Sequence, residues 1–153
     1  MGMKLSSTAF AGNGKIPARY ACDGANLSPP LSWSGAPAGT QSLALVCADP
    51  DAPGGTWYHW AIYDIPPQMT MLAENHASGE GGAIREGTND FNRVGYGGPC
   101  PPHAHGTHHY HFTIYALMVE HLPLKAPSRC RDVERICKAN ALDHASLVGL
   151  YAR

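Results

Sequence analysis

Three apolar segments bounded by turns constrain the fold of this chain more than any other feature. Residues 42–48 place apolar side chains on both faces of an extended segment, which is typical of a buried strand. Residues 57–65 form a second predicted strand that is stopped by Pro66 and Pro67, and residues 109–119 form a third. The 17 glycines and 13 prolines suit short strands joined by tight turns. The chain is therefore predicted to be dominated by β-structure.

The remaining segments are predicted to be loops, with one helix near the C-terminus. Residues 5–40 are rich in Gly, Pro, Ser and Asn, and residues 73–98 form a long polar, Gly-rich loop of the kind that is usually functional. A helix is predicted from an N-cap at Ser128 to about Leu142. Its apolar stripe consists of Cys130, Val133, Ile136, Cys137 and Ala141. With a last short strand at 147–151, these elements favour a β-sandwich or barrel.

Composition and charge indicate one globular domain that spans residues 1–153. Hydrophobic residues make up 44% of the sequence and charged residues 15%, so a disordered chain is not expected. The formal net charge is −1 and there is no basic run, which argues against nucleic acid and anionic membrane surfaces as partners. No apolar run approaches the roughly 18 residues needed to span a bilayer, so no transmembrane segment is predicted.

The cysteines predict reduced thiols and a cytoplasmic protein. They are odd in number, scattered and without a C-x-x-C pair: Cys22, Cys47, Cys100, Cys130 and Cys137. A disulfide framework is therefore not expected. The N-terminus also runs into polar residues without the apolar core of a secretory signal.

Polar and aromatic side chains gather at the ends of the predicted strands. Residues at positions i and i+2 of a strand share a face, so Trp57 should point with His59, and His108 with Tyr110. Two acids, Asp49 and Asp51, follow the first strand. A Gly/Pro segment, Gly97-Gly98-Pro99-Cys100-Pro101-Pro102, would bring backbone N–H groups close to a ligand. Together these pieces predict a ligand pocket.

Each piece also has a simpler explanation. Asp-Pro-Asp is common in plain turns, and a histidine in an aromatic run is more often a packed core residue than a ligand contact. An enzymatic alternative is a hydrolase that uses Asp49, Asp51 and His59. However, the sequence contains no G-x-S-x-G nucleophile motif. Cys100 is flanked by prolines, and it is expected to be an ordinary thiol rather than an activated nucleophile. A non-enzymatic binding protein is therefore favoured.

A cluster of histidines raises the question of a metal. The cluster comprises His103, His105, His108, His109 and His111, and imidazole suits zinc. The first two lie in the Gly/Pro loop, and the last two are predicted to face away from His108 and Tyr110. We therefore predict no native metal site and no cofactor.

At these positions the chain resembles the phosphatidylethanolamine-binding protein family, in its bacterial and archaeal branch of Raf-kinase-inhibitor-like proteins. The resemblance rests on several motifs that occur in order along the chain. They are Asp23-Gly24, Ser28-Pro29-Pro30-Leu31-Ser32-Trp33, Asp49-Pro50-Asp51-Ala52-Pro53, His59-Trp60, Gly98-Pro99-Cys100-Pro101-Pro102, His108-x-Tyr110-x-Phe112 and residues 147–153.

The resemblance implies an antiparallel β-sandwich with Greek-key connections and one or two short C-terminal helices. It also implies a pocket that binds phosphate or other small oxyanions, including phosphorylated head groups. No chemical reaction is agreed for the family. Carried over by motif, the pocket residues are Asp49, Asp51, Trp57, His59, Gly98, Pro99, His108 and Tyr110. The acids would hold His59 or His108 protonated and oriented, or one of them would accept a hydrogen bond from a protonated phosphate or an amine of the ligand. This chain has His109 where the family usually has Arg, which puts surface contacts of that Arg in doubt.

The same resemblance implies protein partners. Family members are described as kinase modulators or protease inhibitors, and members of the bacterial branch as dimers, so a homodimer is expected here. Tyr58 and Trp60 are predicted to share the strand face opposite Trp57 and His59. They would pack in the core between two sheets or, as the less favoured alternative, form a dimer interface.

Overall fold

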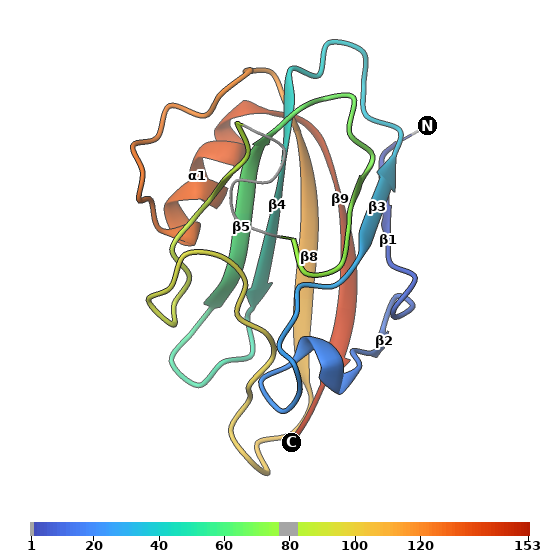
Figure 1. Cartoon of the computed structure of the whole chain (residues 1–153), viewed down its shortest axis with the longest axis vertical. Coiled ribbons are helices and arrows are strands. Elements are labelled where there is room, and N and C mark those ends of the chain that lie inside the picture. The colour runs from blue at the N-terminus through green and yellow to red at the C-terminus, as the bar shows by residue number, and fades with distance from the viewer. Residues whose placement is uncertain (1, 77–82) are drawn as a thin grey trace.

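The computed structural model describes residues 2–76 and 83–153, which form two β-sheets and one α-helix (Figure 1). The smaller sheet has the order β1-β3-β6. Its strands are β1 (Lys4–Ser6), β3 (Leu31–Ser34) and β6 (Met71–Leu72). The larger sheet has the order β2-β9-β8-β4-β5-β7. Its strands are β2 (Gly14–Lys15), β4 (Ser42–Asp49), β5 (Trp57–Ile65), β7 (Arg85–Glu86), β8 (His108–Leu117) and β9 (Ala141–Tyr151).

Strand β4 is buried on both faces because it separates two apolar layers. Leu43, Leu45 and Cys47 face the layer between the two sheets, where Trp33 of the smaller sheet also lies. The alternate residues of β4 face a second layer under α1 (Cys130–Asn140). Figure 1 shows α1 beside β5 and β4, while β1 and β3 lie beside β9. The predicted β-sandwich with one short C-terminal helix is confirmed, although the β2–β9 pair is parallel.

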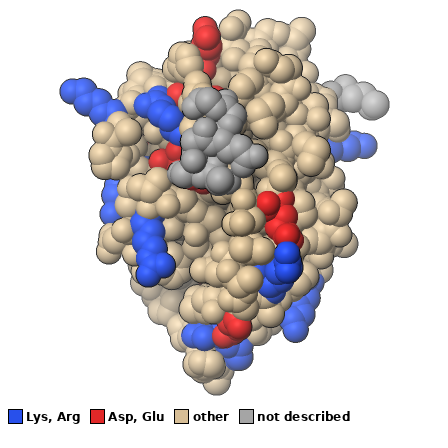
Figure 2. Space-filling model, in the orientation of Figure 1, with Lys and Arg blue, Asp and Glu red and all other residues tan. Residues whose placement is uncertain are grey.

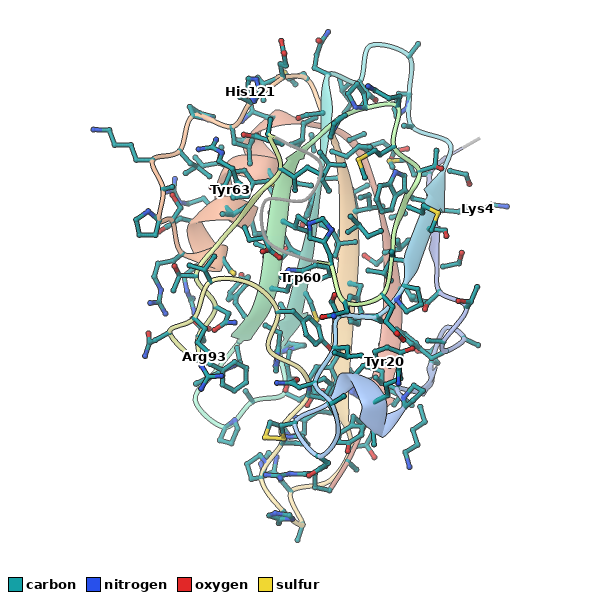
Figure 3. All side chains as sticks on the ribbon, viewed as in Figure 1. Lys4, Tyr20, Trp60, Tyr63, Arg93 and His121 are labelled. Atoms are coloured by element: carbon teal, nitrogen blue, oxygen red, sulfur yellow. A yellow bond between two sulfur atoms is a disulfide. The ribbon has the colours of Figure 1, made fainter. Side chains whose placement is uncertain are left out.

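A β-bulge at the start of β5 changes which side chains point inward. Cys47 pairs with Trp60 but the next residue of β4, Ala48, pairs with Tyr58, so His59 is the extra residue. The prediction that Tyr58 and Trp60 share a face is therefore wrong, because a bulge breaks the period-2 alternation. Trp60 is fully buried between the sheets (Figure 3). Tyr58 packs against the layer under α1. Since Trp60 is enclosed within the chain, it forms no dimer interface.

The C-terminal third differs from the prediction at its boundaries. The helix begins at Cys130 with Arg129 as N-cap, and the Ser128 hydroxyl donates to the carbonyl of Lys125 instead of capping the helix. The last strand is longer than predicted and begins at Ala141, directly after the helix. Ten residue pairs join β8 to β9, with one register shift between Ala116 and Leu117, and this extended pairing overrides the helical pattern at the end of the apolar stripe.

The predicted loop over residues 73–98 is interrupted by β7, whose two residues pair with β5. Its residues 77–82 lie outside the described part of the chain. On the face displayed in Figure 2, acidic and basic side chains are dispersed in small groups on a largely uncharged surface, in keeping with the net charge of −1.

Candidate functional site

The ends of three neighbouring strands enclose a cavity of about 320 Å³. Because β5, β4 and β8 are adjacent and antiparallel, the end of β4 meets the beginnings of β5 and β8 at one edge of the sheet. Polar groups come from Asp49, His59, His108 and Tyr110. The other lining residues are Ala52, Pro53, Trp57, Phe91, Cys100, Pro101 and Pro102. Five of the eight predicted pocket residues therefore line one cavity.

A buried pair, Asp49 and His108, forms the most enclosed part of this site. Oδ2 of Asp49 lies 2.6 Å from Nδ1 of His108. A carboxylate oxygen accepts, so Nδ1 of His108 carries the hydrogen of this bond. The other oxygen of Asp49 accepts from the backbone N–H of Asp51 at 2.8 Å. Asp49 therefore orients His108, which is one of the roles predicted for it.

His59 is held by the Gly/Pro segment. Its Nδ1 donates to the carbonyl oxygen of Gly97 at 2.7 Å, which leaves Nε2 for the cavity. Burial lowers the pKa of His59, although the carbonyl of Gly97 and the charge of Asp49 act in the opposite direction. Asp49 acts in the expected direction, but the expectation that the carboxylates hold His59 protonated is wrong, because the loss of solvent outweighs the nearby charge.

The Tyr110 hydroxyl is buried and has no hydrogen-bond partner among the described residues. Its ring stacks on His108 at 6.3 Å and meets the edge of His59 at 5.2 Å between centroids. Burial raises the pKa of Tyr110 well above its usual range, so the phenol keeps its proton at neutral pH and can donate it. An unpaired buried hydroxyl costs about 1–3 kcal/mol, and such costs mark positions where a ligand can supply the partner.

Two aromatic side chains form the rim of the cavity. Trp57 and Phe91 are each 37% exposed, and their rings meet edge to face at 5.4 Å. Phe91 also contacts the ring of His59 at 5.4 Å. Sequence reasoning missed Phe91, since it lies in the irregular segment between β7 and β8, where periodicity assigns no face.

Asp51 lies outside the cavity. Its Oδ2 accepts from the backbone N–H and from Nδ1 of His109, both at 2.8 Å, and both side chains are largely exposed. These hydrogen bonds lower the pKa of Asp51. His109 faces away from His108 and Tyr110, as the alternation of β8 predicts. The two acids of the Asp-Pro-Asp motif therefore serve different histidines on different faces.

Gly98 and Pro99 do not line this cavity, although Gly98 lines a neighbouring cavity that shares Trp57, Phe91 and Cys100 with it. The N–H of Gly98 donates to Oδ1 of Asn26, and the N–H of Gly97 donates to the carbonyl of His59. The expectation that these two N–H groups serve a ligand is therefore wrong, because protein acceptors already occupy them. A Cβ on Gly98 would lie 2.1 Å from the backbone oxygen of Tyr20, so glycine is needed for this close backbone approach.

The comparisons with known proteins identify the family. The family model "Phosphatidylethanolamine-binding protein" matches residues 6–152. The chain belongs to this family. It is 45% identical to a UPF0098 protein of Aquifex aeolicus over 99% of this chain and 89% of the relative. It is 46% identical to a UPF0098 protein of Methanothermobacter thermautotrophicus over 99% of both chains.

A solved structure places the chain in the same branch of the family. The crystal structure of Escherichia coli YbcL, described as a new member of the mammalian PEBP family, matches with a TM-score of 0.94 and 32% identity. The match covers 100% of this chain and 99% of that one. The predicted membership of the bacterial and archaeal branch of the phosphatidylethanolamine-binding proteins is confirmed.

In this family member a disulfide fastens the cavity wall. Cys22 and Cys100 are bonded, with Cα atoms 5.4 Å apart, and the bond is visible near the lower end of the molecule in Figure 3. The prediction of reduced thiols is wrong for these two cysteines, because the fold brings residues 78 positions apart within bonding distance. The cytoplasmic location, which rested partly on reduced thiols, stays a prediction.

In the part of the chain that the structure describes, the histidines are not gathered into a metal site. No group of three His, Cys, Asp or Glu side chains there is arranged to hold a metal ion. The predicted lack of a metal and a cofactor stays a prediction.

The described part of the chain includes no helix with the length and hydropathy to cross a membrane.

Proposed function

We propose that this protein is a non-enzymatic binder of small oxyanionic ligands such as phosphate and phosphorylated head groups. The observation that carries the proposal is Tyr110, a residue of the cavity lining whose hydroxyl is buried and lacks a partner among the described residues. A ligand oxygen in the cavity would accept this hydrogen bond and remove the cost of burying it.

His59 supplies a second donor once it takes up a proton. Its Nδ1–H is committed to Gly97, so a neutral ring presents the lone pair of Nε2 to the cavity. An oxyanion would favour the imidazolium form, since the Nε2–H can then donate a charge-assisted hydrogen bond. The site is thus suited to an anion whose binding is accompanied by protonation of His59.

The apolar part of the lining suits an organic group attached to the oxyanion. Trp57 and Phe91 at the rim, with Pro53 and Pro101, offer contacts that inorganic phosphate cannot use. Burial of such a group would add affinity in proportion to its apolar area, at about 25 cal/mol per Å². A phosphorylated head group should therefore bind more tightly than phosphate alone.

The geometry does not favour a hydrolase. Asp51 pairs with His109 outside the cavity, and both oxygens of Asp49 already accept hydrogen bonds. The sulfur of Cys100 is in a disulfide, which removes a thiolate nucleophile from the wall. Modulation of a kinase or a protease, and a homodimer, stay predictions that rest on family resemblance.

Tyr110→Phe tests the proposal, with Tyr63→Phe as a matched control. The Tyr63 hydroxyl is also buried without a partner among the described residues, but it lies in the layer under α1, away from the cavity (Figure 3). Sulfate and phosphoethanolamine are titrated by NMR in a buffer free of other oxyanions. We expect Tyr110→Phe to weaken binding about ten- to hundredfold, which is the value of one hydrogen bond to a charged group. The Tyr63→Phe variant should bind as the parent does. Equal affinities for all three proteins would refute the site.

A further inference from the structure

Both ring nitrogens of His108 are already occupied. Nδ1 donates to Asp49, and Nε2 lies 2.6 Å from Nδ1 of His105. The two imidazole rings meet at a steep angle, with centroids 4.9 Å apart. His108 therefore lines the cavity but has no hydrogen-bonding position left for a ligand while His105 stays in place.

His105 reaches this position from an exposed loop that joins the Gly/Pro segment to β8. Figure 1 shows the loop projecting past the end of the larger sheet, near the C-terminus. Its residues from 102 to 107 are all exposed. Within it, Ala104 (φ 60°) and Gly106 (φ 100°) adopt left-handed backbone conformations, and a Cβ on Gly106 would meet open space. The backbone of the loop is tied to the C-terminus by a hydrogen bond of 3.2 Å from the N–H of Ala104 to the carbonyl of Arg153. The side chain of His105 can thus leave His108 without disturbing the sheet.

We propose that His105 is a displaceable cap that occupies the ligand position on His108 and is exchanged for an anion. The inference rests on the proposed function, because it assigns the released Nε2 of His108 to the same oxyanion. His105 acts as a gate on specificity, since it determines which ligands gain access to His108.

The exchange favours anions over neutral ligands. The His105–His108 contact is a single hydrogen bond between two rings, in which one nitrogen must be the acceptor. An oxyanion would instead accept from a His108 that carries hydrogens on both nitrogens, with Asp49 as the acceptor on the opposite side. A charge-assisted hydrogen bond is roughly twice as strong as a neutral one, so an anion gains from displacing His105. A neutral ligand offers no such gain and leaves the cap closed.

His105→Ala tests the cap, with His103→Ala as the matched control. Both histidines are exposed on the same loop, but it is His105 that contacts His108. Since a ligand would no longer compete with His105, sulfate should bind to His105→Ala about three- to tenfold more tightly than to the parent, which corresponds to one neutral hydrogen bond. His103→Ala should leave the affinity unchanged. Equal or weaker sulfate binding by His105→Ala would overturn the cap, because His105 would then be irrelevant or a ligand contact.

A second measurement needs no ligand. Diethyl pyrocarbonate modifies accessible imidazole nitrogens, and mass spectrometry of peptides reports the rate at His108. That rate should rise several-fold in His105→Ala and stay at the parent value in His103→Ala. An unchanged rate would overturn the cap even if sulfate binds. If no variant binds sulfate, the proposed function fails, while the modification rate still decides whether His105 covers His108.

Discussion

Asp49 and His108 form a hydrogen bond of 2.6 Å across neighbouring strands, with side chains that are 4% and 2% exposed. The bond joins the end of β4 to the start of β8, so it couples the stability of the sheet edge to the geometry of the cavity.

Asp49→Asn should lower the free energy of unfolding by up to about 3 kcal/mol, because the amide has one acceptor oxygen for the two hydrogen bonds that the carboxylate accepts from His108 and Asp51, so one buried donor is left facing an NH2 group. Urea denaturation at neutral pH measures the change. Asp51→Asn is the control, since its pair with His109 is exposed and should be worth less than about 1 kcal/mol. Equal losses for the two variants would contradict the role of Asp49.

Cys22→Ser combined with Cys100→Ser should reduce stability by up to about 4 kcal/mol, as expected for a cross-link that closes a loop of this length. Urea denaturation with and without reductant provides the comparison, and the reductant should have little effect on the double variant. Thiol titration of the denatured, oxidised chain should count the three free cysteines, Cys47, Cys130 and Cys137. A count of five would show that the disulfide does not form.

Stability should fall as the pH drops below about 6.5, the ordinary pKa of histidine. Burial lowers the pKa of His59, so the unfolded chain binds a proton in this range that the folded chain does not. The folded state is therefore disfavoured progressively until the pH reaches the lowered pKa. His59→Gln should flatten this part of the profile, whereas exposed His103→Gln should not. Parallel profiles for His59→Gln and the parent would count against a buried neutral His59.

Sulfate should bind more tightly as the pH falls through the same range. Neutral His59 offers a lone pair to the cavity, and it must be protonated before it can donate to the anion. Calorimetry at pH 7 in two buffers of different ionisation enthalpy should reveal net proton uptake on binding. Binding without proton uptake, and with an affinity independent of pH, would exclude His59 as a donor.

Gly98→Ala should destabilise the fold by about 2 kcal/mol, since its Cβ would overlap the backbone oxygen of Tyr20. Gly54→Ala is the control, because no atom lies within 4 Å of a Cβ there. Thermal unfolding of both variants measures the difference. A Gly98→Ala variant as stable as Gly54→Ala would mean that the backbone at Gly98 can move away from Tyr20 at little cost.

The sequence by itself determined the strands and part of the site. Period-2 alternation placed His108 and Tyr110 on one buried face and His109 on the other, and both hold in the structure. The ordered motifs were enough to recognise the family. These features are local, because the backbone of a strand and the pattern of its side chains depend on residues that are close in sequence.

The tertiary structure decided which groups meet. Asp49 rather than Asp51 reaches His108, a bulge turns His59 and Trp60 inward, and Cys22 joins Cys100. Phe91 enters the rim, and His105 covers His108. Most of these contacts join segments 30 or more residues apart, and they depend on strand order, register and loop path. Such relationships are set by the packing of the whole chain, so no local periodicity can encode them.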